Sequence, residues 1–208
     1  MKPELRVTVF SDYICPFCYV GDVRLNRLRE EFDLKVSWCF VEIHPETALE
    51  GEPLQSLDVA PERWQKMMEG LKEMAAEDGL SFDNFTFVAN SAAALQLAEA
   101  TKFLDAEIFY RLHSRLFEAY FSQGQNIGDK DCLRKLALEA GLTESQFEAA
   151  LSDESAVKRL AQYQAAATEL SVRATPTFFI GESRHDGAVP YAQLLTAART
   201  AVKQGSDV

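Results

Sequence analysis

The sequence of 208 residues lacks several features that mark large functional classes. It contains no run of about 18 apolar residues, so we expect no membrane-spanning helix and no membrane partner. Its 21 basic residues are outnumbered by 32 acidic ones, which gives a formal net charge of −11, and no cluster of them would follow a phosphate backbone. Nucleic acid is therefore not an expected partner.

Metal ligands and targeting signals are also scarce. The chain has three histidines and four cysteines, of which only Cys15 and Cys18 form a C-x-x-C pair, so we expect no zinc site. The segment Met1–Arg6 lacks the apolar core of a secretory signal peptide. Unless a longer precursor is trimmed, we expect a cytoplasmic protein. In a reducing compartment its four cysteines are not expected to form structural disulfides.

The composition supports a sizeable folded core, because 47% of the residues are hydrophobic. A buried strand is predicted over Arg6–Ser11, a helix from about Cys15 to Phe32 and a second strand over Leu34–Ile43. A helix between two neighbouring strands predicts a βαβ unit with a parallel pair. Sheet structure is expected again at Thr177–Ile180, with a short edge strand at His185–Ala188.

Helical periodicity dominates the region from about Pro61 to Ala167. Asn90 or Ser91, Asp129 and Thr143 are the expected caps within it. The predicted helices, with a closing one at the C-terminus, are Glu62–Asp78, Ala92–Ala98, Ala106–Phe121, Lys130–Ala140, Phe147–Leu151, Ser155–Leu170 and Tyr191–Val202.

The segment Cys15-Pro16-Phe17-Cys18 directly follows the first strand and opens the first helix. Unsatisfied N–H groups and the positive end of the helix dipole favour a thiolate at the first cysteine, and the thiolate is the nucleophile. Cys18 lies one turn further on, where it can attack a mixed disulfide. The pattern predicts thiol–disulfide exchange with Cys15 and Cys18 as catalytic residues.

A second motif, Thr175-Pro176-Thr177, stands at the mouth of the apolar strand near the C-terminus. Proline cannot donate to a sheet ladder, and an X-Pro bond is where a cis peptide is tolerated. We expect a cis Thr175–Pro176 bond that faces Cys15 and holds an extended substrate backbone. Pro16 and Phe17 are expected to give the site an apolar lip. The predicted substrate-binding residues are Pro16, Phe17, Thr175 and Pro176.

The two motifs together resemble the thioredoxin superfamily, and the arrangement between them resembles the DsbA family. The segments that resemble its FrnE-type branch are Ser11–Gly21, Ile43–Thr47, Leu116–Phe121 and Asn126–Asp129.

The resemblance implies an α/β, thioredoxin-like fold with a large all-helical insertion between the second and third sheet strands. Residues 1–60 and 153–208 would form the thioredoxin-like domain, and residues 61–152 the helical insertion domain. The implied activity is that of a thiol–disulfide oxidoreductase, acting as oxidase, reductase or isomerase on disulfides of proteins or small molecules.

Two departures from the wider superfamily matter for the chemistry. Many relatives have a carboxylate six residues before the first cysteine, where this chain has Val9, so the second thiol would give its proton to water or to Asp12. The dipeptide between the cysteines is Pro-Phe without a histidine, which implies a less oxidising couple. Because Pro-aromatic also resembles glutaredoxins, glutathione is the expected redox partner, and no bound cofactor is expected.

Two alternatives stay open. One is a glutathione-dependent isomerase or transferase of the kappa-class or hydroxychromene-carboxylate type, although those relatives usually have serine where Cys15 stands. The other is a non-catalytic holdase chaperone, which would use the stripe of Met67, Met68 and Met74. The remaining cysteines, Cys39 and Cys132, are interpreted as core residues and His113 as a hydrogen-bonded core or groove residue. The sequence indicates neither the oligomeric state nor the physiological substrate.

Overall fold

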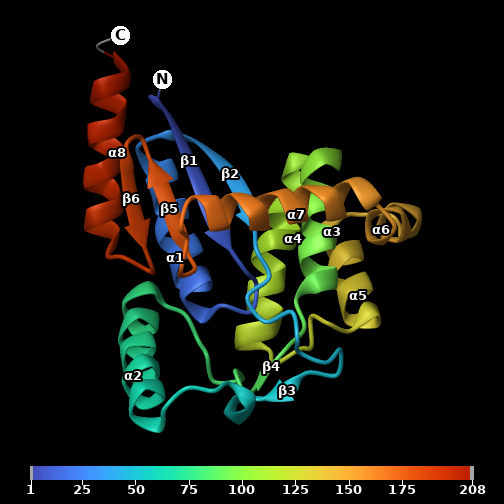
Figure 1. Ribbon diagram of the computed structural model, residues 1–208. Helices are drawn as coiled ribbons and strands as arrows, with labels where there is room; N and C mark the ends of the chain where they lie inside the picture. Colours follow the sequence, from blue (N-terminus) through green and yellow to red (C-terminus); the bar gives the residue numbers. More distant parts are fainter. Residues whose placement is uncertain (1, 207–208) are drawn as a thin grey trace.

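The computed structural model describes residues 2–206, and its centre is a four-stranded mixed sheet (Figure 1). The strand order is β2-β1-β5-β6, formed by β1 (Glu4–Ser11), β2 (Asp33–Phe40), β5 (Thr177–Ile180) and β6 (Ser183–Asp186). The pair β1–β2 is parallel, as predicted, while β1–β5 and β5–β6 are antiparallel. The C-terminal strands therefore lie next to β1, which leads directly into the C-x-x-C segment.

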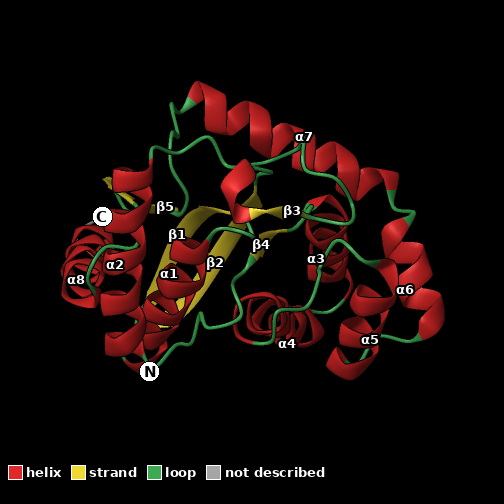
Figure 2. Cartoon of the chain, turned by 90° about the horizontal axis from the view of Figure 1, so that it is seen from below, coloured by secondary structure: helices red, strands yellow, loops and turns green. Residues whose placement is uncertain are grey.

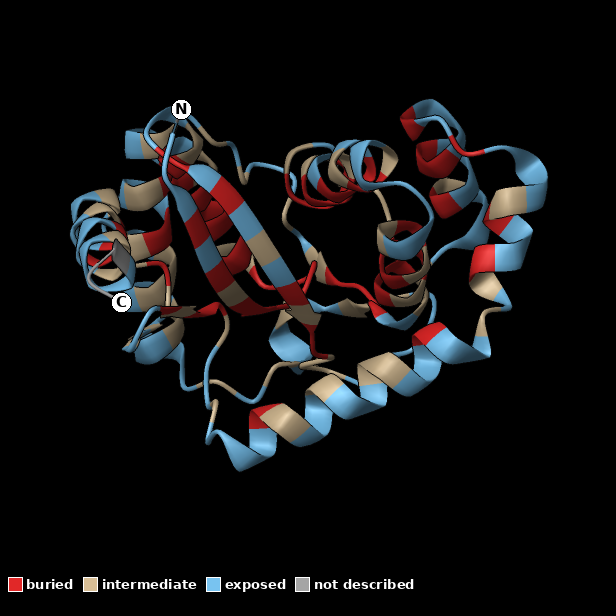
Figure 3. Ribbon diagram, turned by 90° about the horizontal axis from the view of Figure 1, so that it is seen from above, coloured by how far each residue is buried: buried red, intermediate tan, exposed pale blue. Residues whose placement is uncertain are grey.

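Both faces of this sheet are covered by helices (Figure 2). The first face packs on α1 (Pro16–Arg27) and α8 (Tyr191–Ser206), since Val9 and Phe178 share one core with Leu25 and Leu194. The opposite face carries Phe10, which packs with residues of α7 (Glu154–Glu169) in a separate cluster. Exposed and buried residues alternate along the first part of β1, whereas its last three residues, next to the C-x-x-C segment, are all buried (Figure 3).

The long connection between β2 and β5 is mainly helical, as predicted. It consists of a 3₁₀ turn (Leu54–Ser56), α2 (Pro61–Asp78), α3 (Ala92–Leu104), α4 (Ala106–Phe117), a π-helical turn (Glu118–Ser122), α5 (Lys130–Ala140), α6 (Glu144–Leu151) and α7. The predicted caps at Asp129 and Thr143 are confirmed, the latter as a complete capping box with Gln146. Among residues 2–206, no helix is both long enough and apolar enough to cross a bilayer.

Several predicted boundaries differ from the structure, for identifiable reasons. Strand β2 ends at Phe40 rather than Ile43, because the Ile43 N–H donates to the Asp12 carboxylate instead of a neighbouring strand. The first helix ends at Arg27 and continues as a 3₁₀ turn, Leu28–Glu30. The edge strand lies at Ser183–Asp186 rather than His185–Ala188.

The helical region also contains a two-stranded sheet that the sequence pattern does not predict. It pairs β3 (Glu52–Pro53) with β4 (Phe87–Val88), two residues each. The thioredoxin-like fold class is confirmed with this addition. One continuous core contains residues of both the sheet and the helical region, such as Val9 and Phe117. The division into residues 1–60 with 153–208 and residues 61–152 stays a prediction.

Candidate active site

The two cysteines of the C-x-x-C segment lie where β1 ends and α1 begins. Cys15 is the N-cap residue of α1 and Pro16 opens the helix, which suits a position whose N–H would have no partner within the helix. The Cys18 N–H donates to the Cys15 carbonyl over 3.0 Å, which fixes the first turn. Both side chains are buried, with exposed fractions of 5% and 2%.

The two thiols have opposite electrostatic environments. A hydrogen bond from the Cys18 thiol lowers the pKa of Cys15, burial opposes this effect, and a hydrogen bond from the Thr175 side chain supports it. Burial and the Cys15 hydrogen bond raise the pKa of Cys18 well above its ordinary value. The positive end of the helix dipole at the N-terminus of α1 also lowers the pKa of Cys15. Cys15 is therefore the sulfur that ionises first, and Cys18 keeps its proton.

The loop before β5 reaches this pair from the other end of the chain. The Cys15 Sγ lies 3.3 Å from the Thr175 carbonyl oxygen, and the Thr175–Pro176 peptide is cis, so the predicted bond geometry and its position at Cys15 are confirmed. Pro176 packs closely against Gly21 of α1, because a Cβ atom added to Gly21 would lie only 2.9 Å from the Cγ atom of Pro176. The Thr177 hydroxyl lies 2.8 Å from both the Ala174 carbonyl oxygen and the Asp186 carboxylate, and the contact made by its single hydrogen helps to fix the turn.

Asp12, three residues before Cys15, is fully buried and joins three parts of the fold. Its carboxylate accepts hydrogen bonds from the Ile14 N–H (3.2 Å), the Ile43 N–H (2.9 Å) and the Ser91 hydroxyl (3.1 Å). Burial, only partly offset by these bonds, raises its pKa from 3.8 to about 6. Ser91 is indeed the N-cap position of α3, but its hydroxyl serves Asp12 rather than the helix.

The sulfur of Cys18 has its own polar contacts on this side. The Ser11 hydroxyl and the Asp12 backbone N–H both hydrogen-bond to it. Val9 is buried between Trp38 and Phe178 of the neighbouring strands, so the strand position that carries a carboxylate in many relatives is apolar here.

A buried polar network lies behind the C-x-x-C segment and was not predicted as such. The Tyr13 hydroxyl lies 2.8 Å from Nδ1 of His113, whose Nε2 lies 3.2 Å from Asp22. The three residues come from the loop before α1, from α4 and from α1. The interpretation of His113 as a hydrogen-bonded core residue is confirmed. The network ties the helical region to the active-site helix, because His113 of α4 contacts both Tyr13 and Asp22, and Asp22 also accepts a hydrogen bond from Asn26 of α1.

A cavity of about 510 Å³ opens beside Cys15. Pro16 and Phe17 line it together with Cys15, as expected of an apolar lip, whereas Thr175 and Pro176 approach the sulfur from outside its lining. The other lining residues come from the loop before α1, the loop after β2, the segment before α2, α2 itself, the region around β4 and the π-helical turn. This size is typical of a binding site for a small molecule or a peptide segment.

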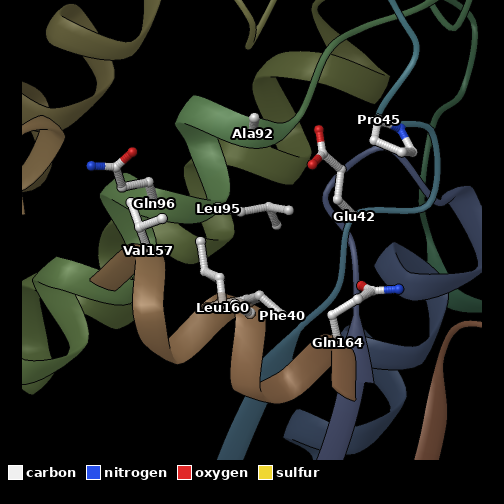
Figure 4. Close-up of a pocket in the computed structure, with 10 residues that line it drawn as sticks. Phe40, Glu42, Pro45, Ala92, Leu95, Gln96, Val157, Leu160 and Gln164 are labelled. Atoms are coloured by element: carbon white, nitrogen blue, oxygen red, sulfur yellow. The ribbon is translucent and has the colours of Figure 1, made fainter. Parts of the chain in front are cut away.

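A second cavity of about 420 Å³ lies between the end of β2, α3 and α7 (Figure 4). Phe40, Leu95 and Leu160 form its apolar part, with Glu42 at its border. The loop after β2 separates the two cavities, since Glu42 and Pro45 line this one while Ile43 and His44 line the other. No cysteine lines the second cavity, so its lining residues carry no thiol chemistry.

The two remaining cysteines are half-buried rather than fully buried as expected. Burial raises the pKa of Cys39 to about 11, and burial followed by the charge of Asp129 raises that of Cys132. All four cysteines are free thiols in the structure. Neither Cys39 nor Cys132 has the electrostatic environment of a reactive thiol.

Comparisons with known proteins agree with this geometry. Residues 6–199 match the family model of the DSBA-like thioredoxin domain. The chain is 31% identical over 188 residues to the uncharacterised protein YwbO of Bacillus subtilis (strain 168), covering 88% of this chain and 90% of that protein.

Two solved structures share the fold. A probable DsbA oxidoreductase from Streptomyces coelicolor superposes with a TM-score of 0.80 at 23% identity, covering 95% of this chain and 90% of that one. A 2-hydroxychromene-2-carboxylate isomerase superposes with a TM-score of 0.71 at 20% identity, covering 97% and 98%.

Proposed function

Because the chain belongs to the family of DSBA-like thioredoxin domains, we propose that it is a thiol–disulfide oxidoreductase whose reacting groups are Cys15 and Cys18. The observation that carries the proposal is the C-x-x-C pair at the start of α1, whose Cys15 Sγ lies 3.3 Å from the Thr175 carbonyl oxygen before the cis Pro176. The environment of the pair lowers the pKa of Cys15 and raises that of Cys18. One nucleophile and one protonated partner in contact are what stepwise disulfide exchange requires.

The proposed reaction has two exchange steps. The Cys15 thiolate attacks one sulfur of a substrate disulfide, which forms a mixed disulfide and releases the other sulfur as a thiolate. Cys18 then loses its proton and attacks the Cys15 sulfur, which releases the second substrate thiolate. The substrate gains two electrons and two protons, and the protein is left with a Cys15–Cys18 disulfide. The reverse sequence oxidises a substrate dithiol, and the direction depends on the partner couple.

The proton of Cys18 needs an acceptor in the second step. We assign this role to the departing substrate thiolate, a base with a pKa of about 8.5 when free. The oxygens of Asp12 already accept three hydrogen bonds, so Asp12 acts as a positioning residue. Its backbone N–H contacts Cys18, and its carboxylate anchors the loop after β2 and the start of α3.

Substrate binding is assigned to Pro16 and Phe17 at the lip of the cavity and to Thr175 and Pro176 beside the Cys15 sulfur. The Thr175 carbonyl is close enough to Cys15 to pair with the backbone of an extended segment carrying the disulfide. Glutathione as redox partner, a cytoplasmic location and membership of the FrnE-type branch stay predictions.

The test is turnover of a protein disulfide. Reduction of insulin in the presence of a thiol reductant should be lost in Cys15→Ser. Cys18→Ser should accumulate mixed disulfides on Cys15 that disappear with added reductant. The matched control is the Cys39→Ala/Cys132→Ala double variant, which should keep its activity within a few fold. Equal trapping by Cys15→Ser, or loss of activity in a folded control variant, would contradict the assignment.

The similarity to a hydroxychromene-carboxylate isomerase supports one second candidate, a glutathione-dependent isomerase or transferase. Conjugation of glutathione to an electrophile separates the two activities. If Cys15→Ser retains conjugation while wild-type protein reduces no disulfide, the second candidate holds.

A further inference from the structure

The cavity beside Cys15 combines apolar walls with acidic groups. We propose that it selects disulfides carried by extended polypeptide segments with apolar and basic residues next to the cysteine. The inference rests on the proposed function, because it concerns the substrate of the same site.

Access to the sulfur requires a slender substrate. Cys15 is only 5% exposed, and the cavity of about 510 Å³ is its opening. A folded surface cannot bring a disulfide to so buried an atom, whereas a single extended strand can. The walls suit apolar side chains, because they include Phe17, Ile43, Leu57, Trp64, Met67 and Phe85.

The charged groups of the lining have one dominant sign. Glu46, Glu52 and Asp58 line the cavity, and neither lysine nor arginine is among its lining residues. The one basic side chain is His44, whose Nδ1 lies 3.1 Å from Glu46. Even with His44 protonated, the three carboxylates leave the lining negative.

A negative cavity favours cationic substrates and opposes anionic ones. Glu46 and Asp58 are exposed and Glu52 is half-buried, so their attraction for a cation acts partly through solvent and is weakened by salt. Lysine or arginine flanking the substrate cysteine would gain from these charges. Glutathione carries two carboxylates and one ammonium group, so its net negative charge works against it here. The whole chain has a formal net charge of −11, which also attracts cations, so the test must separate local from overall charge.

The experiment uses three synthetic peptides with one cysteine each, flanked by leucine and then by lysine, glutamine or glutamate. Each cysteine is joined to thiopyridine as a mixed disulfide. Attack by Cys15 on the peptide sulfur releases thiopyridone, and absorbance follows the rate with pre-reduced protein.

We expect the lysine peptide to react roughly tenfold or more faster than the glutamate peptide at low ionic strength. The ratio should shrink as salt is added. Oxidised glutathione, followed by the loss of free protein thiols, should react more slowly than the glutamine peptide.

Two triple variants separate the cavity from the overall charge. Glu46→Gln/Glu52→Gln/Asp58→Asn should lose most of the lysine-to-glutamate ratio. The control, Asp131→Asn/Glu169→Gln/Glu182→Gln, removes three charges from exposed positions outside the cavity lining and should keep the ratio.

The outcomes distinguish this inference from the proposed function. An equal ratio in both triple variants, or no difference between the lysine and glutamate peptides, would overturn the selectivity while the reaction of the glutamine peptide still supports disulfide exchange. If wild-type protein reacts with none of the peptides, the proposed function fails and the inference with it.

Discussion

Asp12→Asn is the change with the most specific expected effect, because it removes a buried carboxyl without changing its size. In the folded protein this carboxyl has a pKa of about 6 instead of 3.8, with burial as the largest cause. The folded state therefore binds the Asp12 proton more tightly than the unfolded state does. The resulting stabilisation is complete below about pH 3.8 and is lost as the pH rises through about 6.

The size of the effect follows from the shift. About 2.2 pKa units at 1.36 kcal/mol each give about 3 kcal/mol between about pH 7 and about pH 3. The difference in free energy of unfolding, wild type minus Asp12→Asn, should thus be about 3 kcal/mol more favourable at the lower pH. The variant also loses a hydrogen bond, because the side-chain NH₂ group of the asparagine replaces an oxygen that accepts from a donor in the wild type. This loss destabilises the variant by about 1–3 kcal/mol at every pH.

The assay is urea unfolding of both proteins at several pH values, with the difference taken at each pH. Asp153→Asn is the matched control, for which the pH dependence of the stability difference should have the opposite sign. Its carboxyl is partly exposed and has a lowered pKa, chiefly through a hydrogen bond from Ser155, so its small contribution is lost as the pH falls. A wild-type–Asp12→Asn difference that stays constant within about 1 kcal/mol, or that grows with rising pH, would refute the reasoning.

The same substitution should also change the active site. The negative charge of Asp12 raises the pKa of Cys15, so Asp12→Asn should lower the Cys15 pKa further. The rate of alkylation as a function of pH measures it, and an unchanged or raised pKa would contradict the electrostatic coupling.

Two further predictions concern the same pair of motifs. Limited alkylation of the reduced protein near neutral pH should label Cys15 before the three other cysteines, all of which have raised pKa values, and earlier labelling of any of those would contradict the assignment. Gly21→Ala should lower insulin-reductase activity and destabilise the fold by about 1–3 kcal/mol, because its Cβ would lie 2.9 Å from Pro176. Gly70→Ala, whose Cβ meets nothing within 4 Å, is the control and should be neutral or stabilising.

The sequence predicts those parts of the fold whose signals are local. The apolar β-branched run of β1 and the C-x-x-C after it place Cys15 at a helix start, and the structure agrees. The capping residues Asp129 and Thr143 are also local signals, because cap and capped N–H lie within three residues.

Contacts between distant residues escape the sequence pattern. Ser91 reads as an ordinary helix cap, yet its hydroxyl binds Asp12, which lies 79 positions earlier. The bond between Tyr13 and His113 spans 100 positions, and no periodicity encodes such a pairing. The two-residue strands β3 and β4 form only because tertiary packing brings them together.

The acidic residues of the cavity beside Cys15 could not be predicted from the sequence either. Glu46, Glu52 and Asp58 follow one another at intervals of six residues, but they lie in an irregular segment with Gly51 and Pro53, where a spacing does not indicate a common face. The structure brings these residues to Cys15 through the loop after β2 and the segment before α2.

A redox titration of the protein in glutathione buffers tests the central claim most directly. Samples equilibrated at increasing ratios of oxidised to reduced glutathione are quenched with acid, alkylated and mapped by mass spectrometry. We predict one two-electron transition in which a single disulfide forms between Cys15 and Cys18, while Cys39 and Cys132 stay alkylated throughout. A disulfide that involves Cys39 or Cys132, or a Cys15–Cys18 pair that stays reduced in every buffer and with stronger oxidants, would contradict the account.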